Sequence, residues 1–269
     1  MMNFEKDMLE VDLFYKNRIS TLISVFEKNN INGFYAKDKE EALNLIKKFI
    51  FDNIKEGDKI GIADSVSLHQ VSLFDWLYSD LCDYNIINPF KRLDDGRFSE
   101  FEGVPNDWIP ADEYNRINER IWQKAREALL SDVFITSVNA VTMDGKLVAT
   151  DGVGNRIAGI IYGPKKVLLV VGRNKIVENV QEAMSRISNI VAPINALRHS
   201  LKHRIQGEKA EANYGIYKLG KLPCVTQGHC IDCNSSLCTR HCTMVMDKST
   251  GGFYKNRVNI IIVNENLGI

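Results

Sequence analysis

The sequence has no long hydrophobic run and no surplus of charge of either sign. Its longest apolar stretches, including 167–171 and 260–263, are far too short to cross a bilayer. Lysine and arginine together number 34, as do aspartate and glutamate, so the formal net charge is zero. A neutral chain offers no electrostatic reason to bind nucleic acid or anionic membranes nonspecifically, and we expect neither as a partner.

The first residues also lack a targeting signal. The segment 1–8 has no basic region followed by an uninterrupted apolar stretch, which argues against a secretory leader. We therefore expect a cytoplasmic protein. In a reducing cytosol, neighbouring thiols are expected to hold a metal or to undergo redox chemistry rather than to form structural disulfides.

Cysteine is scarce outside one short segment. Of the six cysteines, Cys82 stands alone in an apolar helical context and is predicted to be a core residue. The other five are close in sequence and are candidate metal ligands: Cys224, Cys230, Cys233, Cys238 and Cys242. Four thiolates at such spacing suit a tetrahedral zinc ion or a [4Fe–4S] cluster. Reduced or reversibly oxidised thiols are the alternative, and the spacing leaves open which four would be the ligands.

The rest of the chain alternates between amphipathic helices and short apolar strands, which is the pattern of an α/β fold. An Asp-Gly pair at 144–145 between two apolar runs predicts a hairpin. We expect helices over 4–28, 38–50, 68–81, 112–130, 155–161, 178–187 and 195–205, and strands over 59–63, 133–137, 139–142, 147–150, 166–171, 190–191 and 257–263. The chain then divides into an N-terminal helix over 1–30, an α/β domain over 31–206, and a cysteine-rich loop with C-terminal strands over 207–269 that packs on the domain.

A long segment over 88–111, with several prolines and glycines, interrupts this alternation. Phe90, Phe98, Phe101 and Trp108 are distributed along it. Loops of this length in a compact domain are often lids or binding loops. The alternative is a surface excursion whose aromatic side chains simply pack on the body of the domain.

The turn from Asp151 to Arg156, which reads Asp-Gly-Val-Gly-Asn-Arg, lies between a predicted strand and a predicted helix. Its two glycines allow the backbone to approach a ligand closely, and the helix N-terminus favours an anion. Arg156 could add a bidentate contact to phosphate or carboxylate. A Rossmann fingerprint would need glycine or alanine where Ile157 stands, and the chain has no Walker-type Gly-Lys-Ser/Thr. A purely structural turn is the alternative.

Further polar residues lie at predicted strand ends and helix starts, positions that converge on one crevice in open α/β sheets. We expect a small anionic metabolite to bind in the crevice formed mainly by 137–198. The candidate ligand-binding residues are Ser65, Asn139, Gly152, Gly154, Asn155, Arg156, Asn174, Asn195 and Arg198. Asp144, Asp151 and Lys175 are candidate acids or bases for a reaction. His199 and His203 stand four apart on a predicted helix, and without a third ligand they are expected on its solvated face.

The strand-end motifs resemble the LUD (lactate utilisation) domain family. The matching segments are 137–148, 151–156, 163–165, 172–177 and 192–198, together with 223–235 in the cysteine loop and 265–268 at the C-terminus. The resemblance implies an open α/β sheet flanked by helices, similar to the NagB, ribose-phosphate isomerase and CoA-transferase superfamily, with a small C-terminal cysteine-rich element. It also implies a bacterial role associated with lactate oxidation, in which larger relatives work beside iron–sulfur proteins. The resemblance thus implies a metabolic context, and it does not specify the reaction.

Two functional hypotheses follow. In the first, the protein is an enzyme or accessory factor of lactate or 2-hydroxy-acid metabolism that binds its anionic ligand in the crevice. In the second, it is a metal- or iron–sulfur-containing module that docks on redox proteins of lactate oxidation and transfers electrons. The sequence is also compatible with a homo-oligomer. An isomerase or CoA transferase would rest on fold analogy alone.

Overall fold

The computed structural model describes residues 4–79, 84–93, 98–104, 110–204, 221–235, 238–249 and 255–269. Cys82 and Trp108 lie outside these residues, as does the side chain of His203. The predictions made for these three side chains therefore stay predictions. None of the helices in the described ranges combines the length and the apolar character needed to cross a bilayer.

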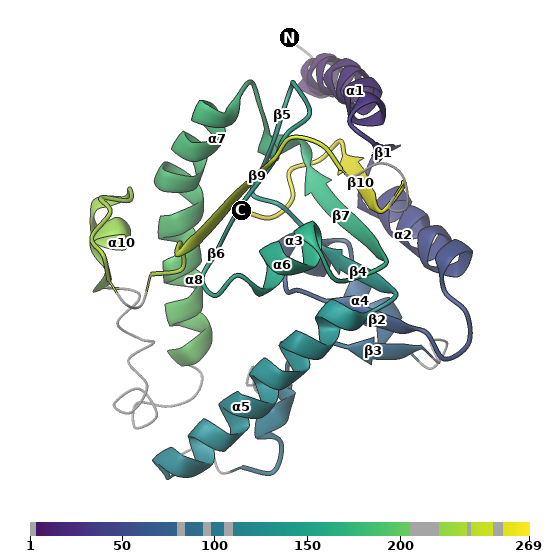
Figure 1. The fold of residues 1–269 in the computed structure, drawn as a ribbon. Coiled ribbons are helices and arrows are strands. Elements are labelled where there is room, and N and C mark those ends of the chain that lie inside the picture. Colours follow the sequence, from purple (N-terminus) through teal and green to yellow (C-terminus); the bar gives the residue numbers. More distant parts are fainter. Residues whose placement is uncertain are drawn as a thin grey trace.

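The centre of the fold is a parallel sheet of six strands in the order β1-β10-β7-β4-β2-β3 (Figure 1). Most of these strands are continuous apolar runs, as expected for strands that are covered on both faces. The strands are β1 (Ile31–Ala36), β2 (Lys59–Ile62), β3 (Asn85–Ile87), β4 (Val133–Thr136), β7 (Lys166–Gly172) and β10 (Val258–Val263).

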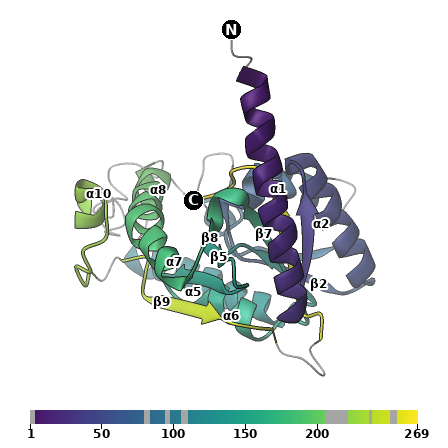
Figure 2. The ribbon, with the colours of Figure 1, turned by 90° about the horizontal axis from the view of Figure 1, so that it is seen from above.

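Helices cover both faces of this sheet. Helix α1 (Phe4–Lys28) and helix α6 (Asn155–Ile161) pack on one face, where Phe26, Ile160 and Leu169 belong to one buried apolar cluster. Helix α2 (Lys39–Asn53) covers the other face with the short helices α3 (Val66–Gln70) and α4 (Leu73–Leu77). The remaining helices are α5 (Ala111–Glu127), α7 (Val180–Arg186), α8 (Ala192–Arg204) and α10 (Pro223–Gln227). The predicted α/β class with a helix-flanked open sheet is confirmed (Figures 1 and 2).

A second, smaller sheet has the order β8-β5-β6-β9. Its strands are β5 (Ala140–Thr142), β6 (Leu147–Asp151), β8 (Ile176–Val177) and β9 (Cys242–Met246). Strands β5 and β6 form the antiparallel hairpin that the Asp-Gly pair predicted. Strand β9 pairs with β6 along its whole length, with Cys242 opposite Asp151. This pairing ties the cysteine-rich segment to the glycine turn.

Some local predictions were wrong or incomplete. Residues 190–191 are not a strand: a π-helical turn over Ile187–Val191 joins α7 to α8. Ile187 and Val191 are four residues apart, so in a helix both reach the same apolar cluster. Strands β1, β3, β8 and β9 were not predicted. In the segment 88–111, the described aromatic residues pack with Ile117 and Ile121 of α5.

Candidate functional site

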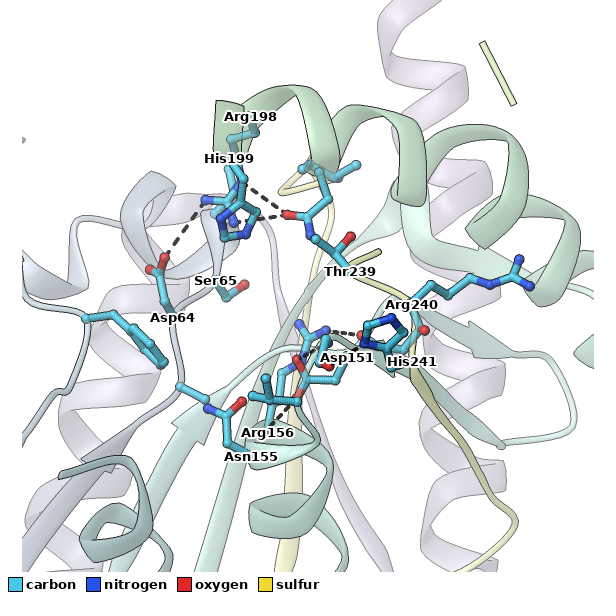
Figure 3. A pocket seen from close by; sticks show the side chains of 18 of the residues that line it. Asp64, Ser65, Asp151, Asn155, Arg156, Arg198, His199, Thr239, Arg240 and His241 are labelled. Atoms are coloured by element: carbon cyan, nitrogen blue, oxygen red, sulfur yellow. Dashed lines mark hydrogen bonds and ion pairs between the residues drawn. The ribbon is translucent and has the colours of Figure 1, made fainter. Parts of the chain in front are cut away.

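A cavity of about 520 Å³ opens at the carboxyl edge of the central sheet (Figure 3). Asp64 and Ser65 enter it directly after β2, Asn139 after β4, and Lys175 after β7. Because parallel strands end at the same edge, these sequence-distant residues meet there. Helices α5, α6 and α8 and residues 238–241 of the cysteine-rich segment complete its wall.

The glycine turn positions Arg156 in the first turn of α6. Gly154 adopts the left-handed conformation with φ of 87°, which a residue with a side chain would adopt at a cost. The Asp151 carboxylate accepts hydrogen bonds from the backbone N–H groups of Gly152 (2.9 Å) and Arg156 (3.0 Å). The carboxylate therefore stabilises the start of the helix from within the cavity wall.

The Arg156 guanidinium is only partly satisfied by the protein. Its Nη2 donates to the backbone oxygen of Thr150 (2.6 Å) and to Oδ1 of Asn139 (3.3 Å). Its Nε is buried and has no hydrogen-bond partner among the described residues. A buried charged donor without an acceptor lowers the free energy of unfolding, and an anionic group of a ligand could accept its hydrogen bond and remove this penalty.

A second arginine lies across the cavity on α8. Arg198 donates to Oδ1 of Asn195 at 3.1 Å, and its Nη1 is 3.9 Å from the carboxylate of Asp64. Asp64 also contacts His69, with 2.8 Å between Oδ1 and Nε2. Burial lowers the pKa of Arg198, the charge of Asp64 opposes this shift, and the charge of Arg156 adds to it. The two arginines therefore act on each other through the cavity.

Lys175 is the most deeply buried basic residue of the site, at 3% exposed. Its Nζ donates to the hydroxyl oxygens of Ser67 (3.0 Å) and Ser137 (3.1 Å) and to the backbone oxygen of Val138 (3.2 Å). Burial lowers the pKa of Lys175 well below its ordinary value, and the charges of Arg186 and Arg156 lower it further. No ion pair of Lys175 with a carboxylate occurs in the described part of the chain, so only neutral oxygens offset its charge.

Part of the cavity lining is aromatic. It is formed by side chains of the 88–111 segment and of α5: Phe90, Phe98, Phe101, Tyr114 and Trp122. The rings pack on the body of the domain and also line the cavity. A role as a lid or binding loop stays a prediction. The lining combines cationic and apolar side chains, and Arg92 lies 4.0 Å from the centre of the Phe98 ring. Such a combination is typical of pockets that orient a ligand by a few polar groups.

Comparison with known proteins identifies the family. The family model of the LUD domain matches residues 19–263, which is most of the chain. The chain belongs to the LUD domain family. A search of curated proteins finds no match. Among solved structures, a DUF162 family protein from Deinococcus radiodurans matches with 12% identity and a TM-score of 0.42, covering 94% of this chain and 98% of that one. The LUD domain family is associated with lactate utilisation.

The cavity of this LUD domain protein brings together most of the predicted site residues. Those that line it are Ser65, Asn139, Asp151, Gly152, Asn155, Arg156, Lys175, Asn195 and Arg198. Three others lie outside its lining. Asp144 sits on the β5–β6 hairpin, where hydrogen bonds from Lys146 and Thr142 lower the pKa of its carboxyl. Gly154 contributes its backbone conformation, and Asn174 accepts from the backbone N–H of Leu267 at 2.9 Å.

Several lining residues of the LUD domain cavity had not been predicted. Asp64 stands beside Ser65 at the end of β2, so its position in sequence was a usable signal. Arg92, Tyr114 and Trp122 offered no such signal, because they reach the cavity only through the folding of the aromatic segment onto α5. Residues 238–241 also offered no such signal, because they reach the cavity only through the pairing of β9 with β6.

The cysteine-rich segment of the LUD domain protein borders a second cavity of about 240 Å³. Four cysteines line it: Cys224, Cys230, Cys233 and Cys238. Burial raises the pKa of the Cys224 thiol, and the charges of the other three thiols raise it further. Residues 238–241 line both cavities, so the cysteine-rich segment adjoins the ligand-sized cavity.

Proposed function

We propose that this LUD domain protein binds a small anionic metabolite, a carboxylate or a phosphorylated compound, in the larger cavity as part of lactate or related 2-hydroxy-acid utilisation. The charge of the lining supports this. It includes five arginine or lysine side chains and only two acidic ones, Asp64 and Asp151. Both carboxylates are already engaged by protein groups. Arg240 is paired with Asp232, which lies outside this lining, and an anionic ligand would balance the positive charge that remains.

Arg156 is the observation that carries this proposal. Its buried Nε lacks an acceptor among the described residues, and the charge of Arg156 lowers the pKa of both Lys175 and Arg198. Like charges that face one cavity raise the free energy of the protein without ligand. A bound anion would remove this repulsion and satisfy the guanidinium, which favours binding over an unliganded cavity.

The size of the cavity also bears on the ligand. A three-carbon acid such as lactate would fill only a small part of about 520 Å³. The aromatic side chains of the lining offer an apolar surface for a larger substituent, while its arginine side chains would bind the acid group. We therefore propose a 2-hydroxy or 2-oxo acid with an apolar substituent as a better fit than lactate itself. Asp151 and Lys175 are the proposed proton carriers for any reaction of such a ligand.

Thermal unfolding with a panel of anions tests the proposal. Lactate, pyruvate, phosphate and phenyllactate are compared on the native protein and on Arg156→Gln, Arg198→Gln and Arg116→Gln. Arg116 is the matched control, since it forms an exposed pair with Asp112 outside the cavity lining. Loss of a charge-assisted hydrogen bond costs about 1.5–3 kcal/mol, so affinity should fall by about tenfold to a hundredfold in the first two variants.

Phenyllactate is expected to raise the unfolding temperature more than lactate at equal concentration. The Arg116 variant should respond like the native protein. Equal shifts in all the variants would contradict a binding role for Arg156 and Arg198, and a complete lack of response to every anion would contradict the proposed ligand class.

A further inference from the structure

The smaller cavity separates the five clustered cysteines into two groups. Cys224 lies on α10, and Cys230, Cys233 and Cys238 lie on the loop that follows it; all four line the cavity. Cys242 does not line it. It belongs to β9, where it pairs with Asp151 and its sulfur faces the glycine turn at Gly154. Folding therefore selects four thiols from five, which the spacing alone left open.

The arrangement of these thiols favours a polynuclear centre over a single ion. A zinc ion holds each sulfur at about 2.3 Å, so its four sulfurs must converge on one point. In a [4Fe–4S] cluster each thiolate binds a different iron, and the sulfurs stand apart around a body that needs space. Four cysteines around a cavity of about 240 Å³ fit the second geometry.

The polar groups beside the cavity include hydrogen-bond donors and one carboxylate, Asp232, whose Oδ1 lies 3.7 Å from Sγ of Cys230. The backbone N–H of Arg240 donates to Sγ of Cys238, with 3.3 Å between nitrogen and sulfur. The Arg240 guanidinium is held beside the cavity by Ser188 (2.9 Å) and Asp232. Amide hydrogen bonds to sulfur and nearby positive charge are among the factors that stabilise and tune iron–sulfur centres.

Apolar contacts contribute little to holding this loop. Its apolar cluster has three buried members, Ala196, Leu222 and Cys224, with partial support from Val225 and Cys230. A segment with so small a core usually needs a covalent or metal crosslink to keep one conformation. Four cysteines around one cavity are a suitable set for such a crosslink.

We propose that Cys224, Cys230, Cys233 and Cys238 bind a [4Fe–4S] cluster in the smaller cavity. Cys242 is not a ligand and acts in the pairing of β9 with β6. The inference is independent of the proposed ligand, since it rests on another cavity. It places the cluster directly beside the ligand cavity, because residues 238–241 form a wall common to both.

Anaerobic reconstitution of the full chain tests this site. The reduced protein is incubated with ferrous iron and sulfide, desalted, and analysed for iron, sulfide and zinc together with its visible absorption. The native protein should become brown and retain about four iron and four sulfide per chain. Cys224→Ser, Cys230→Ser, Cys233→Ser and Cys238→Ser should each lose most of the iron. Cys242→Ser, the matched control, should retain it.

Far-ultraviolet circular dichroism of each variant separates loss of the cluster from loss of the fold. Should a serine variant be unfolded, the iron and sulfide content of the native protein and of Cys242→Ser still decides the question. Colourless protein that retains about one zinc per chain would overturn the cluster. Loss of iron in Cys242→Ser, with the fold intact, would overturn the assignment of the ligands.

Discussion

The imidazole Nδ1 of His241 lies 3.1 Å from the backbone oxygen of Gly152 and donates a hydrogen bond to it. The backbone N–H of His241 also donates to the backbone oxygen of Asp151 at 3.0 Å. These two bonds join the cysteine-rich segment to the glycine turn, next to the point where β9 pairs with β6. Through this contact, a segment nearly 90 residues away in sequence forms part of the cavity that Arg156 lines.

Replacement of His241 by leucine should weaken this junction. The change removes the side-chain hydrogen bond to Gly152 while keeping a side chain of comparable bulk, and we expect the free energy of unfolding to fall by about 0.5–1.5 kcal/mol. Urea denaturation measures the change. His229→Leu is the control, because His229 is exposed and, within the part of the chain that the structure describes, its ring bonds to the nearby backbone of Gln227 alone. Equal losses in the two variants would argue against a specific role of the junction.

Replacement of Gly268 by alanine should destabilise the protein more than the same change at Gly57. Both glycines have positive φ, +68° and +85°, and alanine in that region costs about 1–2 kcal/mol. At Gly57 the new Cβ would meet nothing within 4 Å, whereas at Gly268 it would lie 2.5 Å from Oγ of Ser67 and 2.7 Å from Nζ of Lys175. Urea unfolding of the two variants gives the comparison. If Gly268→Ala is no less stable than Gly57→Ala, the C-terminal segment does not pack closely against Lys175.

Lys175 should make stability depend on pH in the alkaline range. Its folded-state pKa lies below the ordinary 10.5, so at pH values between the two the unfolded chain binds more protons than the folded chain. The free energy of unfolding should therefore rise as pH approaches 10.5 from below. Lys175→Met should flatten this rise, while Lys48→Met, at an exposed position of α2, should keep it. Parallel curves for the two variants would contradict the shift.

Trp122 should report ligand binding by its fluorescence. It lines the larger cavity together with other aromatic side chains, whereas Trp76 packs against Phe51 and does not line the cavity. Titration with phenyllactate is expected to change the emission of the native protein and of Trp76→Phe, because the ligand alters the surroundings of the indole ring of Trp122. Trp122→Phe should lose most of this change. An unaltered response in Trp122→Phe would place the ligand elsewhere.

The local sequence predicted secondary structure correctly where the surroundings of each residue depend mainly on its neighbours in the chain. The apolar runs of β4, β7 and β10 are buried on both faces, and their composition alone predicted them. The turn at Asp151 and the hairpin at Gly145 were predicted by glycine, which permits backbone conformations that other residues avoid. In contrast, Ile190 and Val191 suit either a strand or a helix, and only packing decides between them.

The sequence by itself determined the α/β class, the turn that carries Arg156 and the presence of clustered thiols, because these depend on composition and on short-range geometry. Tertiary structure decided which residues meet. It left Asp144 on a hairpin away from the cavity lining and brought Lys175 next to Ser67. It also placed four cysteines around one cavity, whereas Cys242 lies on β9 opposite Asp151 of β6. Such outcomes depend on strand order and on pairing between distant segments, which no local pattern of residues encodes.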